Sequence, residues 1–585
     1  MVSKTNEQAL EASIEKYLTG TCSEEQLMVR EDAAECPFGP NHGYRRGRAQ
    51  DFNARYAVDT RWLWQFLHDS QPDELERLKQ RYDDWDLRIL ERFDRLAKKY
   101  GLLHLLKRGL AIDDVHFNLM YPAPLASSSE RVNLHFATNI FSSSRQVRYS
   151  LSNTLEEIDM VLFINGLPFA SLELKNPWTG QTARYHGQKQ YKHDRDSSQP
   201  LLQFGRCLVH MTVDTDEVYM TTKLAGDATF FLPFNKGHNH GAGNPLNRDG
   251  HRSAYLWREI FSRESVANII QHFVRLDGTS KTPLTKRTLF FPRYHQLDVV
   301  RELVAHASSH GVGQRYLIQH SAGSGKSNSI TWAAYQLIET YPASLDVAGA
   351  RGLDVPLFDS VIVVTDRRLL DKQLRENIRD FSEVKNIIAP ALKSSDLKHA
   401  LEQGKKIIIT TIQKFPVIVE GIDDMSSKRF AVIIDEAHGS QDGSSHGKMN
   451  RVMGGDELDD AQEKILGAIK KSKMQGNASY FAFTATPKNS TLEKFGQLQA
   501  DGRFEPFHLY SMKQAIEEGF ILDVLANYTT YKSYYEIRKS IEDNPLFDKL
   551  KAQKKLRTYV ERDQQTINAK AEIMLDHFIE QLARQ

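Results

Sequence analysis

The chain has 585 residues, of which 40% are hydrophobic and 26% are charged, and its formal net charge at pH 7 is +1. These are ordinary globular values, and at about 150 residues per domain the length predicts three or four domains. The near-neutral balance excludes an overall basic signature, so any nucleic-acid surface has to be local.

The cysteines argue for a reducing environment. Cys22, Cys36 and Cys207 are widely spaced and form no C-x-x-C pair, which argues against a disulfide framework or a zinc ribbon. The N-terminus has no apolar signal segment, and no later run approaches the length of a membrane span. We therefore expect a soluble, cytoplasmic protein without a membrane partner.

Residues 7–110 are predicted to be mainly helical, because apolar residues recur there at spacings of three and four. From about residue 113 the pattern changes, and stretches 116–119, 132–136 and 146–151 alternate as strands do. Further strands are expected at 207–213 and 217–222, followed by one amphipathic helix over about 253–275. The Gly-, Ser- and Pro-containing stretch 277–283 is the best candidate for a linker.

Two apolar runs, 158–164 and 168–174, flank Asn165-Gly166, which is the strongest short signal for a β-hairpin. With the turn centred there, the numbers of paired residues sum to about 332, which places Asp159 opposite or diagonal to Glu173. Glu173 and Lys175 are two residues apart on one strand and so share a face.

Two carboxylates and an ammonium at one position predict phosphodiester hydrolysis. Asp159 and Glu173 can hold Mg2+, while Lys175 can orient the attacking water or stabilise the charged phosphorane. The alternative is a surface cluster of cross-strand ion pairs. The next helix mixes basic and aromatic residues, so Gln188 and Tyr191 are candidate DNA contacts, although a solvated helix face explains this pattern almost as well.

The stretch 319–327 joins an apolar strand to a helix through a glycine-rich loop. In such a loop the backbone N–H groups converge on phosphate, Lys326 reaches the terminal phosphates, and Ser327 can ligate Mg2+. The full P-loop pattern has glycine where this chain has His320. The predicted nucleotide contacts are Ser321, Ala322, Gly323, Ser324, Gly325, Lys326 and Ser327.

Four later apolar strands end in polar residues, which predicts a parallel sheet with a ligand crevice at its carboxyl edge. The four polar ends begin at Thr365, Thr410, Asp435 and Thr484. In the third of them, Asp435 is placed to hold Mg2+ on the phosphates and Glu436 to activate the hydrolytic water.

In order, the motifs Q-H-S-A-G-S-G-K-S, T-D-R-R, T-T, D-E-A-H and T-A-T-P resemble motifs I, Ia, Ib, II and III of superfamily 2 helicases and translocases. Arg367 and Thr411 lie in the second and third of these motifs and are candidate DNA contacts. The upstream F-P-R-Y-H-Q resembles the motif whose glutamine reads adenine, which makes Gln296 the candidate for base selection.

The hairpin resembles the PD-(D/E)xK nuclease core, with Asp159, Glu173 and Lys175. A nuclease of this type before a DEAH-box motor resembles the restriction (R, HsdR-type) subunit of Type I restriction-modification enzymes. The resemblance implies ATP and Mg2+ as cofactors and duplex DNA as substrate. It also implies a methyltransferase and a specificity subunit as partners, with S-adenosylmethionine bound by the complex rather than by this chain. Family nucleases often add Q-x-x-x-Y. Gln181 to Tyr185 has that spacing, whereas Gln188 to Tyr191 lies nearer the expected place but is one residue short.

The fold class expected is α/β. A PD-(D/E)xK nuclease domain occupies residues 1–278, a RecA-like motor domain 285–500, and a connector with the start of a second RecA-like domain 501–585. Motifs V and VI of a complete motor are absent, which predicts an N-terminal fragment that turns ATP over slowly by itself. Two other functions remain open, namely a stand-alone repair or defence helicase-nuclease and an RNA-remodelling DEAH ATPase.

Overall fold

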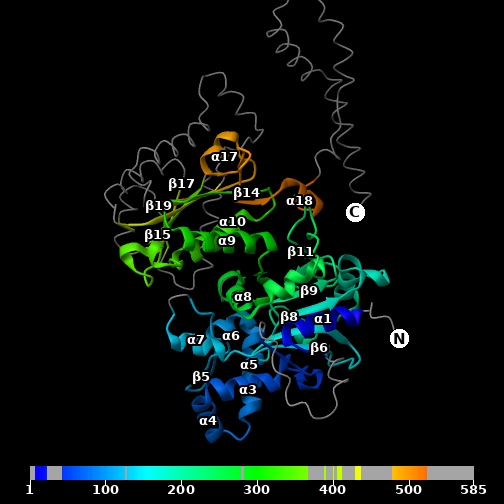
Figure 1. The fold of residues 1–585 in the computed structure, drawn as a ribbon. Helices are drawn as coiled ribbons and strands as arrows, with labels where there is room; N and C mark the ends of the chain where they lie inside the picture. The colour runs from blue at the N-terminus through cyan, green and yellow to red at the C-terminus, as the bar shows by residue number, and fades with distance from the viewer. Residues whose placement is uncertain are drawn as a thin grey trace, which may run out of the picture. The chain divides into compact units, whose positions relative to one another are not determined.

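The computed structural model describes residues 7–22, 43–125, 128–278, 282–365, 388–390, 399–400, 405–411, 428–435 and 477–522. The chain divides into two compact units, Met1–Phe520 and Ile521–Gln585. Within the described ranges the first unit holds two seven-stranded sheets with helices beside them (Figure 1). This confirms the α/β fold class. None of the described helices combines the length and apolar character that a bilayer crossing needs.

The first sheet has the order β1-β6-β7-β8-β9-β10-β11 and mixes parallel and antiparallel pairs. Its strands are β1 (Tyr44–Arg46), β6 (Phe141–Arg148), β7 (Glu157–Ile164), β8 (Leu167–Leu174), β9 (Val209–Val213), β10 (Val218–Thr221) and β11 (Leu232–Pro233). All residues of β8 are buried, as expected for a central strand covered on both faces.

The N-terminal part also contains α-helices. They are α1 (Glu7–Thr19), α3 (Thr60–Ser70), α4 (Pro72–Arg81), α5 (Trp85–Tyr100), α6 (Leu102–Arg108), α7 (Glu130–Ala137) and α8 (Arg263–Asn268). Two short hairpins, β2 (Phe52–Asn53) with β3 (Val58–Asp59) and β4 (Leu110–Ile112) with β5 (Val115–Phe117), interrupt the helices. The prediction of a mainly helical start followed by strands is therefore confirmed.

Two expectations for this part were wrong. Residues 132–136 belong to helix α7 and not to a strand, since only Phe136 among them is buried while Leu134 is 60% exposed. The predicted helix over 253–275 is broken at Phe261 and Ser262, so that a π-helical turn, Leu256–Ile260, precedes α8 and a second, Ile269–Phe273, follows it.

The second sheet is parallel throughout, as predicted, with the order β16-β17-β15-β18-β19-β14-β22. Its strands are β14 (Arg315–His320), β15 (Ser360–Thr365), β16 (Ile388–Pro390), β17 (Ile407–Thr411), β18 (Phe430–Asp435), β19 (Ala478–Thr484) and β22 (His508–Tyr510). Because β22 pairs with β14, this sheet continues beyond residue 500, where the sequence places a domain boundary. Its described helices are α9 (Tyr294–His310), α10 (Lys326–Ile338), α11 (Leu345–Ala348), α17 (Asn489–Phe495) and α18 (Met512–Glu517).

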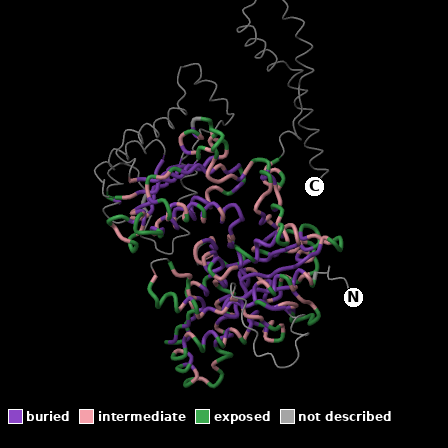
Figure 2. The backbone as a smooth tube through the Cα atoms, viewed as in Figure 1, coloured by how far each residue is buried: buried purple, intermediate pink, exposed green. Residues whose placement is uncertain are grey.

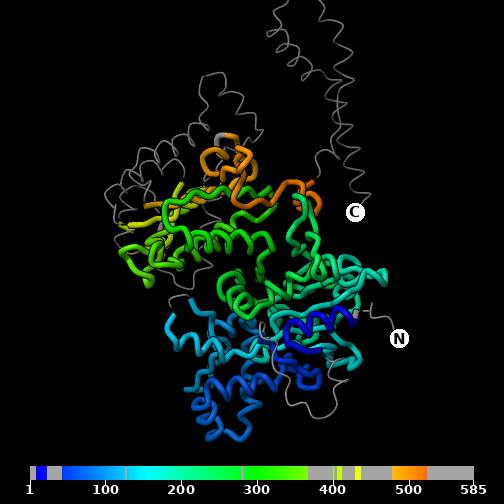
Figure 3. Tube along the Cα trace, in the orientation of Figure 1, coloured from blue at the N-terminus to red at the C-terminus, as the bar shows by residue number. Residues whose placement is uncertain are grey.

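Buried backbone concentrates along the strands of both sheets (Figure 2). Figure 3 follows the chain from the first sheet region, in blue to teal, into the second, in green to orange. Near the predicted linker, of which residues 279–281 lie outside the described ranges, β12 (Arg275–Leu276) pairs with β13 (Leu289–Phe290). Trp332 of α10 donates its indole N–H to the Phe273 carbonyl at 2.9 Å, so the two regions share buried contacts.

Candidate functional site

The hairpin that carries the predicted carboxylates is fixed at its turn. Asn165 and Gly166 both have positive φ, 52° and 77°, which is the backbone that a tight two-residue hairpin turn needs. The Asn165 amide bonds the carbonyl of Leu119 and the backbone N–H of Ile140. The register pairs Met160 with Leu172, which confirms the predicted sum of 332. One step further along the hairpin, Asp159 and Glu173 occupy opposing positions.

Asp159, Glu173 and Lys175 meet at one end of β7 and β8, as the sequence predicts. The Lys175 ammonium lies 3.7 Å from Oδ2 of Asp159, and the backbone N–H of Leu174 donates to the same oxygen at 2.7 Å. Asp159 keeps 13% of its side chain exposed, whereas that of Glu173 is fully buried. An acidic site with a cation at its edge therefore exists, with one carboxylate reachable from solvent.

Glu173 has a cationic neighbour that the sequence reasoning did not single out. The Arg195 guanidinium donates through Nε to Oε1 of Glu173 at 2.8 Å, and 10% of the Arg195 side chain is exposed. Burial and the nearby charge of Asp159 raise the pKa of Glu173 well above its usual range, against the lowering effect of Arg195. Burial by itself lowers the pKa of Arg195. The Glu173 carboxylate outweighs this effect and raises the pKa of Arg195 above its usual value. Arg195 lies 22 residues after Glu173, so no local sequence pattern predicts this ion pair.

The donor set fits a divalent metal ion of the Mg2+ type. Oε2 of Glu173 is buried and has no hydrogen-bond partner among the described residues, which leaves an acceptor unused beside Asp159. Within the same ranges no group of three His, Cys, Asp or Glu side chains converges, so a metal here would have two protein carboxylates. Mg2+ commonly binds through one or two carboxylates and keeps several waters.

Helix α1 brings further acids towards this end of the sheet. Glu11 and Glu15 are 2% and 1% exposed, and Arg145 of β6 pairs with both, at 2.8 and 3.1 Å. Burial, and then the charge of Asp159, raise the pKa of Glu11, while Arg145 lowers it. The sequence reasoning missed this network, because acidic residues on an amphipathic helix have the same pattern as a solvated face.

The two candidate tyrosines of the Q-x-x-x-Y motif lie in different environments. Tyr185 is 69% exposed, whereas Tyr191 is fully buried and its hydroxyl contacts Ser171 Oγ of β8 at 2.7 Å. Ser171 also bonds Nδ1 of His210 at 2.7 Å, and burial lowers the pKa of that imidazole to about 3. Tyr191 therefore attaches its helix to β8, and Gln188 is half-buried. The assignment of both residues as DNA contacts stays a prediction.

The P-loop follows β14 and leads into α10, as predicted. Gly323 and Gly325 have φ of 72° and 77°, and both are exposed together with Ala322. The Lys326 ammonium donates to the His320 carbonyl at 3.3 Å. The hydroxyls of Ser321 and Ser324 are buried and have no partner among the described residues. Open backbone with unused donors fits a phosphate-bearing ligand, and Ser327 at the start of α10 is half-buried.

Gln296 lies against the loop that it was predicted to serve. Its amide donates to the carbonyl of Ser324 at 2.9 Å and accepts from the Arg293 N–H at 3.0 Å. Arg293 in turn donates to the Gly323 carbonyl at 3.2 Å and pairs with Glu518 at 2.9 Å. In this structure Gln296 supports the phosphate loop, and its assignment as the reader of adenine stays a prediction.

Asp435 ends β18 and is 5% exposed, and Thr411 ends β17 and is 7% exposed. In the sheet β19 alone separates β18 from β14, and its Phe483 pairs with both Asp435 and Ile318. At about 4.8 Å per strand, Asp435 lies roughly 10 Å across the sheet from the strand that leads into the P-loop. Glu436 and Arg367 lie outside the described residues.

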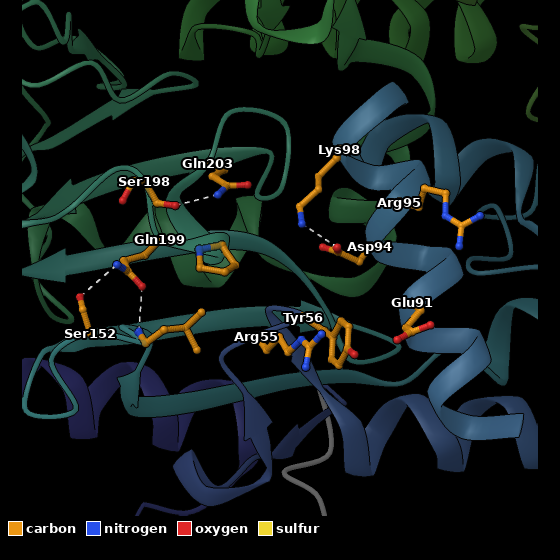
Figure 4. Close-up of a pocket in the computed structure, with 12 residues that line it drawn as sticks. Arg55, Tyr56, Glu91, Asp94, Arg95, Lys98, Ser152, Ser198, Gln199 and Gln203 are labelled. Atoms are coloured by element: carbon orange, nitrogen blue, oxygen red, sulfur yellow. Dashed lines mark hydrogen bonds and ion pairs between the residues drawn. The ribbon is translucent and has the colours of Figure 1, made fainter. Parts of the chain in front are cut away.

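A separate pocket of about 740 Å3 opens on the N-terminal part (Figure 4). It is lined by Arg55, Tyr56, Glu91, Asp94, Arg95, Lys98, Leu151, Ser152, Ser198, Gln199, Pro200 and Gln203. Lys98 and the buried Arg206 both pair with Asp94. Arg55 and Arg95 form no ion pair within the described residues, so the lining carries excess positive charge.

Comparisons with known proteins match both halves of the chain. Residues 65–229 match the family of the Type I restriction enzyme R protein N terminus, and residues 295–565 match the SWI2/SNF2 ATPase family. The HindI endonuclease subunit, a Type I restriction enzyme of Haemophilus influenzae, is 24% identical over 427 residues, which cover 70% of this chain and 36% of that protein. A Type I endonuclease subunit of Staphylococcus saprophyticus is 25% identical over 408 residues, which cover 67% and 37%.

Among solved structures, the SWI2/SNF2 ATPase core of Sulfolobus solfataricus in complex with double-stranded DNA aligns over 33% of this chain and 31% of that one, at 15% identity and a TM-score of 0.21. The chain spans somewhat more than a third of the length of the curated relatives that it matches. The chain therefore combines a region similar to the Type I restriction enzyme R protein N terminus with a region similar to the SWI2/SNF2 ATPase family, and it is similar to curated endonuclease subunits of Type I restriction enzymes.

Proposed function

We propose that this chain supplies the nuclease and the first motor domain of an ATP-dependent DNA translocase and endonuclease that cuts unmodified duplex DNA. The observation that carries the proposal is the meeting of Asp159, Glu173 and Lys175 at one strand end, on the same chain as a P-loop with open backbone. Relatives named as Type I restriction endonuclease subunits support the same activity. The partners that we propose are a methyltransferase subunit, a specificity subunit and duplex DNA, with S-adenosylmethionine bound elsewhere in the complex.

In the nuclease centre, Asp159 and Glu173 would hold Mg2+, which when bound supplies Lewis acidity and an activated water. Lys175 is buried, 3.7 Å from Asp159, where its ammonium can orient a water or offset charge on the scissile phosphate. The Leu174 N–H fixes the Asp159 carboxylate at 2.7 Å, so the position of this ligand is set by the β8 backbone. The chain's own contribution is thus to orient two carboxylates and one cation.

In the motor, Lys326 and Ser327 begin α10 directly after the loop, and Asp435 ends β18 at the same edge of the parallel sheet. ATP bound with Mg2+ supplies the phosphoanhydride whose hydrolysis drives movement. Backbone N–H groups of Ala322, Gly323 and Gly325 would bind phosphate, Lys326 would neutralise its charge, and Ser327 and Asp435 would hold the metal. Glu436, the next residue after Asp435, is proposed as the group that activates water.

Two substitutions test the proposal in the assembled enzyme. Glu173→Ala should lower plasmid cutting by orders of magnitude while ATP hydrolysis and triplex displacement persist, because only the nuclease loses a metal ligand. Lys326→Ala should abolish ATP hydrolysis, translocation and cutting together. Glu157→Ala, on the same hairpin and in a partly exposed pair with Arg148, is the matched control and should leave all three intact. Undiminished cutting by Glu173→Ala would reduce the cluster to a structural ion-pair network.

A further inference from the structure

The two oxygens of the Glu173 carboxylate have different environments. Oε1 accepts a hydrogen bond from Nε of Arg195 at 2.8 Å. Oε2 is buried and has no partner within the described residues. A buried carboxylate oxygen without a hydrogen-bond partner costs free energy of folding. We therefore expect Oε2 to bind a ligand that the protein itself does not provide.

Contacts other than that with Glu173 hold Arg195 in place. Its helical turn, Gln190–Asp194, is attached to β8 by the bond between the hydroxyls of Tyr191 and Ser171, and Ser171 precedes Glu173 by two residues on the same strand. The Arg195 guanidinium also lies over the ring of Tyr149, 5.9 Å from its centroid. The same helix is therefore held against β8 at Ser171 and at Glu173, which leaves the Glu173 side chain little rotational freedom.

We propose that Arg195 is a positioning residue of the nuclease centre: by holding Oε1 of Glu173 it directs Oε2 towards a divalent metal ion shared with Asp159. This inference rests on the proposed nuclease function and adds to it a residue outside the Asp159, Glu173 and Lys175 set. Metal-binding side chains are commonly oriented by such outer partners, whose loss costs about 10- to 100-fold in metal affinity or activity.

A competing reading is that Arg195 is a counter-ion that stands where the metal would bind. A stand-in for the metal would bridge both carboxylates. Instead Arg195 pairs only with Glu173 among the described residues, through one oxygen. The cation that approaches Asp159 is Lys175, at 3.7 Å. The two readings predict opposite signs, because removing a competing cation should strengthen metal binding, whereas removing a positioning residue should weaken it.

The test measures Mn2+ binding to the nucleotide-free chain by the electron paramagnetic resonance signal of free Mn2+, with Glu173→Ala defining the site. Arg195→Gln should weaken that site about 10- to 100-fold. Arg195→Lys should recover part of the loss, because it keeps the charge without the planar geometry. Lys189→Gln removes an exposed charge from the same segment and should change nothing. In the assembled enzyme the Mg2+ concentration for half-maximal cutting should rise in parallel.

Unchanged or tighter Mn2+ binding by Arg195→Gln overturns the inference, and so does an equal loss in Lys189→Gln. Hydrogen exchange of the β7 and β8 amides reports whether the hairpin is intact. If Arg195→Gln loosens the hairpin, the result for Arg195→Lys decides alone. A Mn2+ affinity of Arg195→Lys below that of the wild type then supports the inference, and a wild-type affinity contradicts it. A wild-type chain without a Mn2+ site that depends on Glu173 would instead contradict the proposed nuclease function.

Discussion

The turn of the hairpin that carries Asp159 and Glu173 offers a prediction whose size follows from the structure. Gly166 has φ of 77°, and a Cβ added there would lie 2.3 Å from the carbonyl oxygen of Asp59 and 2.7 Å from the backbone nitrogen of Leu63. Both obstacles are backbone atoms at the start of α3 and cannot rotate away. Gly166→Ala should therefore cost about 1–2 kcal/mol for the left-handed backbone and about 1–3 kcal/mol more for overpacking.

Gly180 is the matched control for this substitution. Its φ is 78°, yet nothing lies within 4 Å of a Cβ placed there. Gly180→Ala should cost only the backbone part, about 1–2 kcal/mol. Hydrogen exchange followed by mass spectrometry on β7 and β8 gives the local opening free energies. Equal losses in the two variants would refute the reasoning, because the close approach to Asp59 would then have no energetic consequence.

The remaining predictions concern charge. Burial raises the pKa of Asp59 from 3.8 to about 6. The folded state therefore binds this proton more tightly than the unfolded state. The resulting contribution to the free energy of unfolding is present near pH 4 and is lost as the pH rises through 6. Asp59→Asn should then stabilise the N-terminal domain at pH 7 by up to about 3 kcal/mol, with the gain vanishing near pH 4 in denaturant titrations. A gain that does not depend on pH would contradict this cause. Arg55 and Arg95 give the pocket its excess positive charge, so we expect them to contact DNA phosphates. Replacing both by Gln should weaken DNA binding and flatten its salt dependence by about 0.9 for each phosphate that is no longer neutralised, while Lys99→Gln, outside the pocket on the same helix as Arg95, should have no effect. Unaltered salt dependence would show that DNA does not reach the pocket. Finally, Lys326→Ala should remove nucleotide-dependent protection of α10 in hydrogen exchange, and protection equal to that of the wild type would refute the phosphate-binding role of this lysine.

The sequence alone determined the features that depend on neighbours in the chain. The Asn165-Gly166 turn specifies a hairpin, and the period of two then sets which side chains share a face, so that Asp159, Glu173 and Lys175 could be placed together. The P-loop could be recognised because its strand, loop and helix are contiguous. Polar residues after apolar strands marked the carboxyl edge of a parallel sheet before any strand order was known.

Tertiary structure decided the contacts between segments that are distant in the chain. The bond of Arg195 to Glu173 depends on a helix being held against β8 through Tyr191, and no local pattern specifies which face of that helix turns inwards. The same reason explains why residues 132–136 form a helix. Their alternation resembles that of a strand, yet this stretch pairs with no strand among the described residues and buries only Phe136. Local periodicity indicates whether a segment is a helix or a strand and which of its side chains share a face. Packing between elements decides which distant side chain joins a functional site.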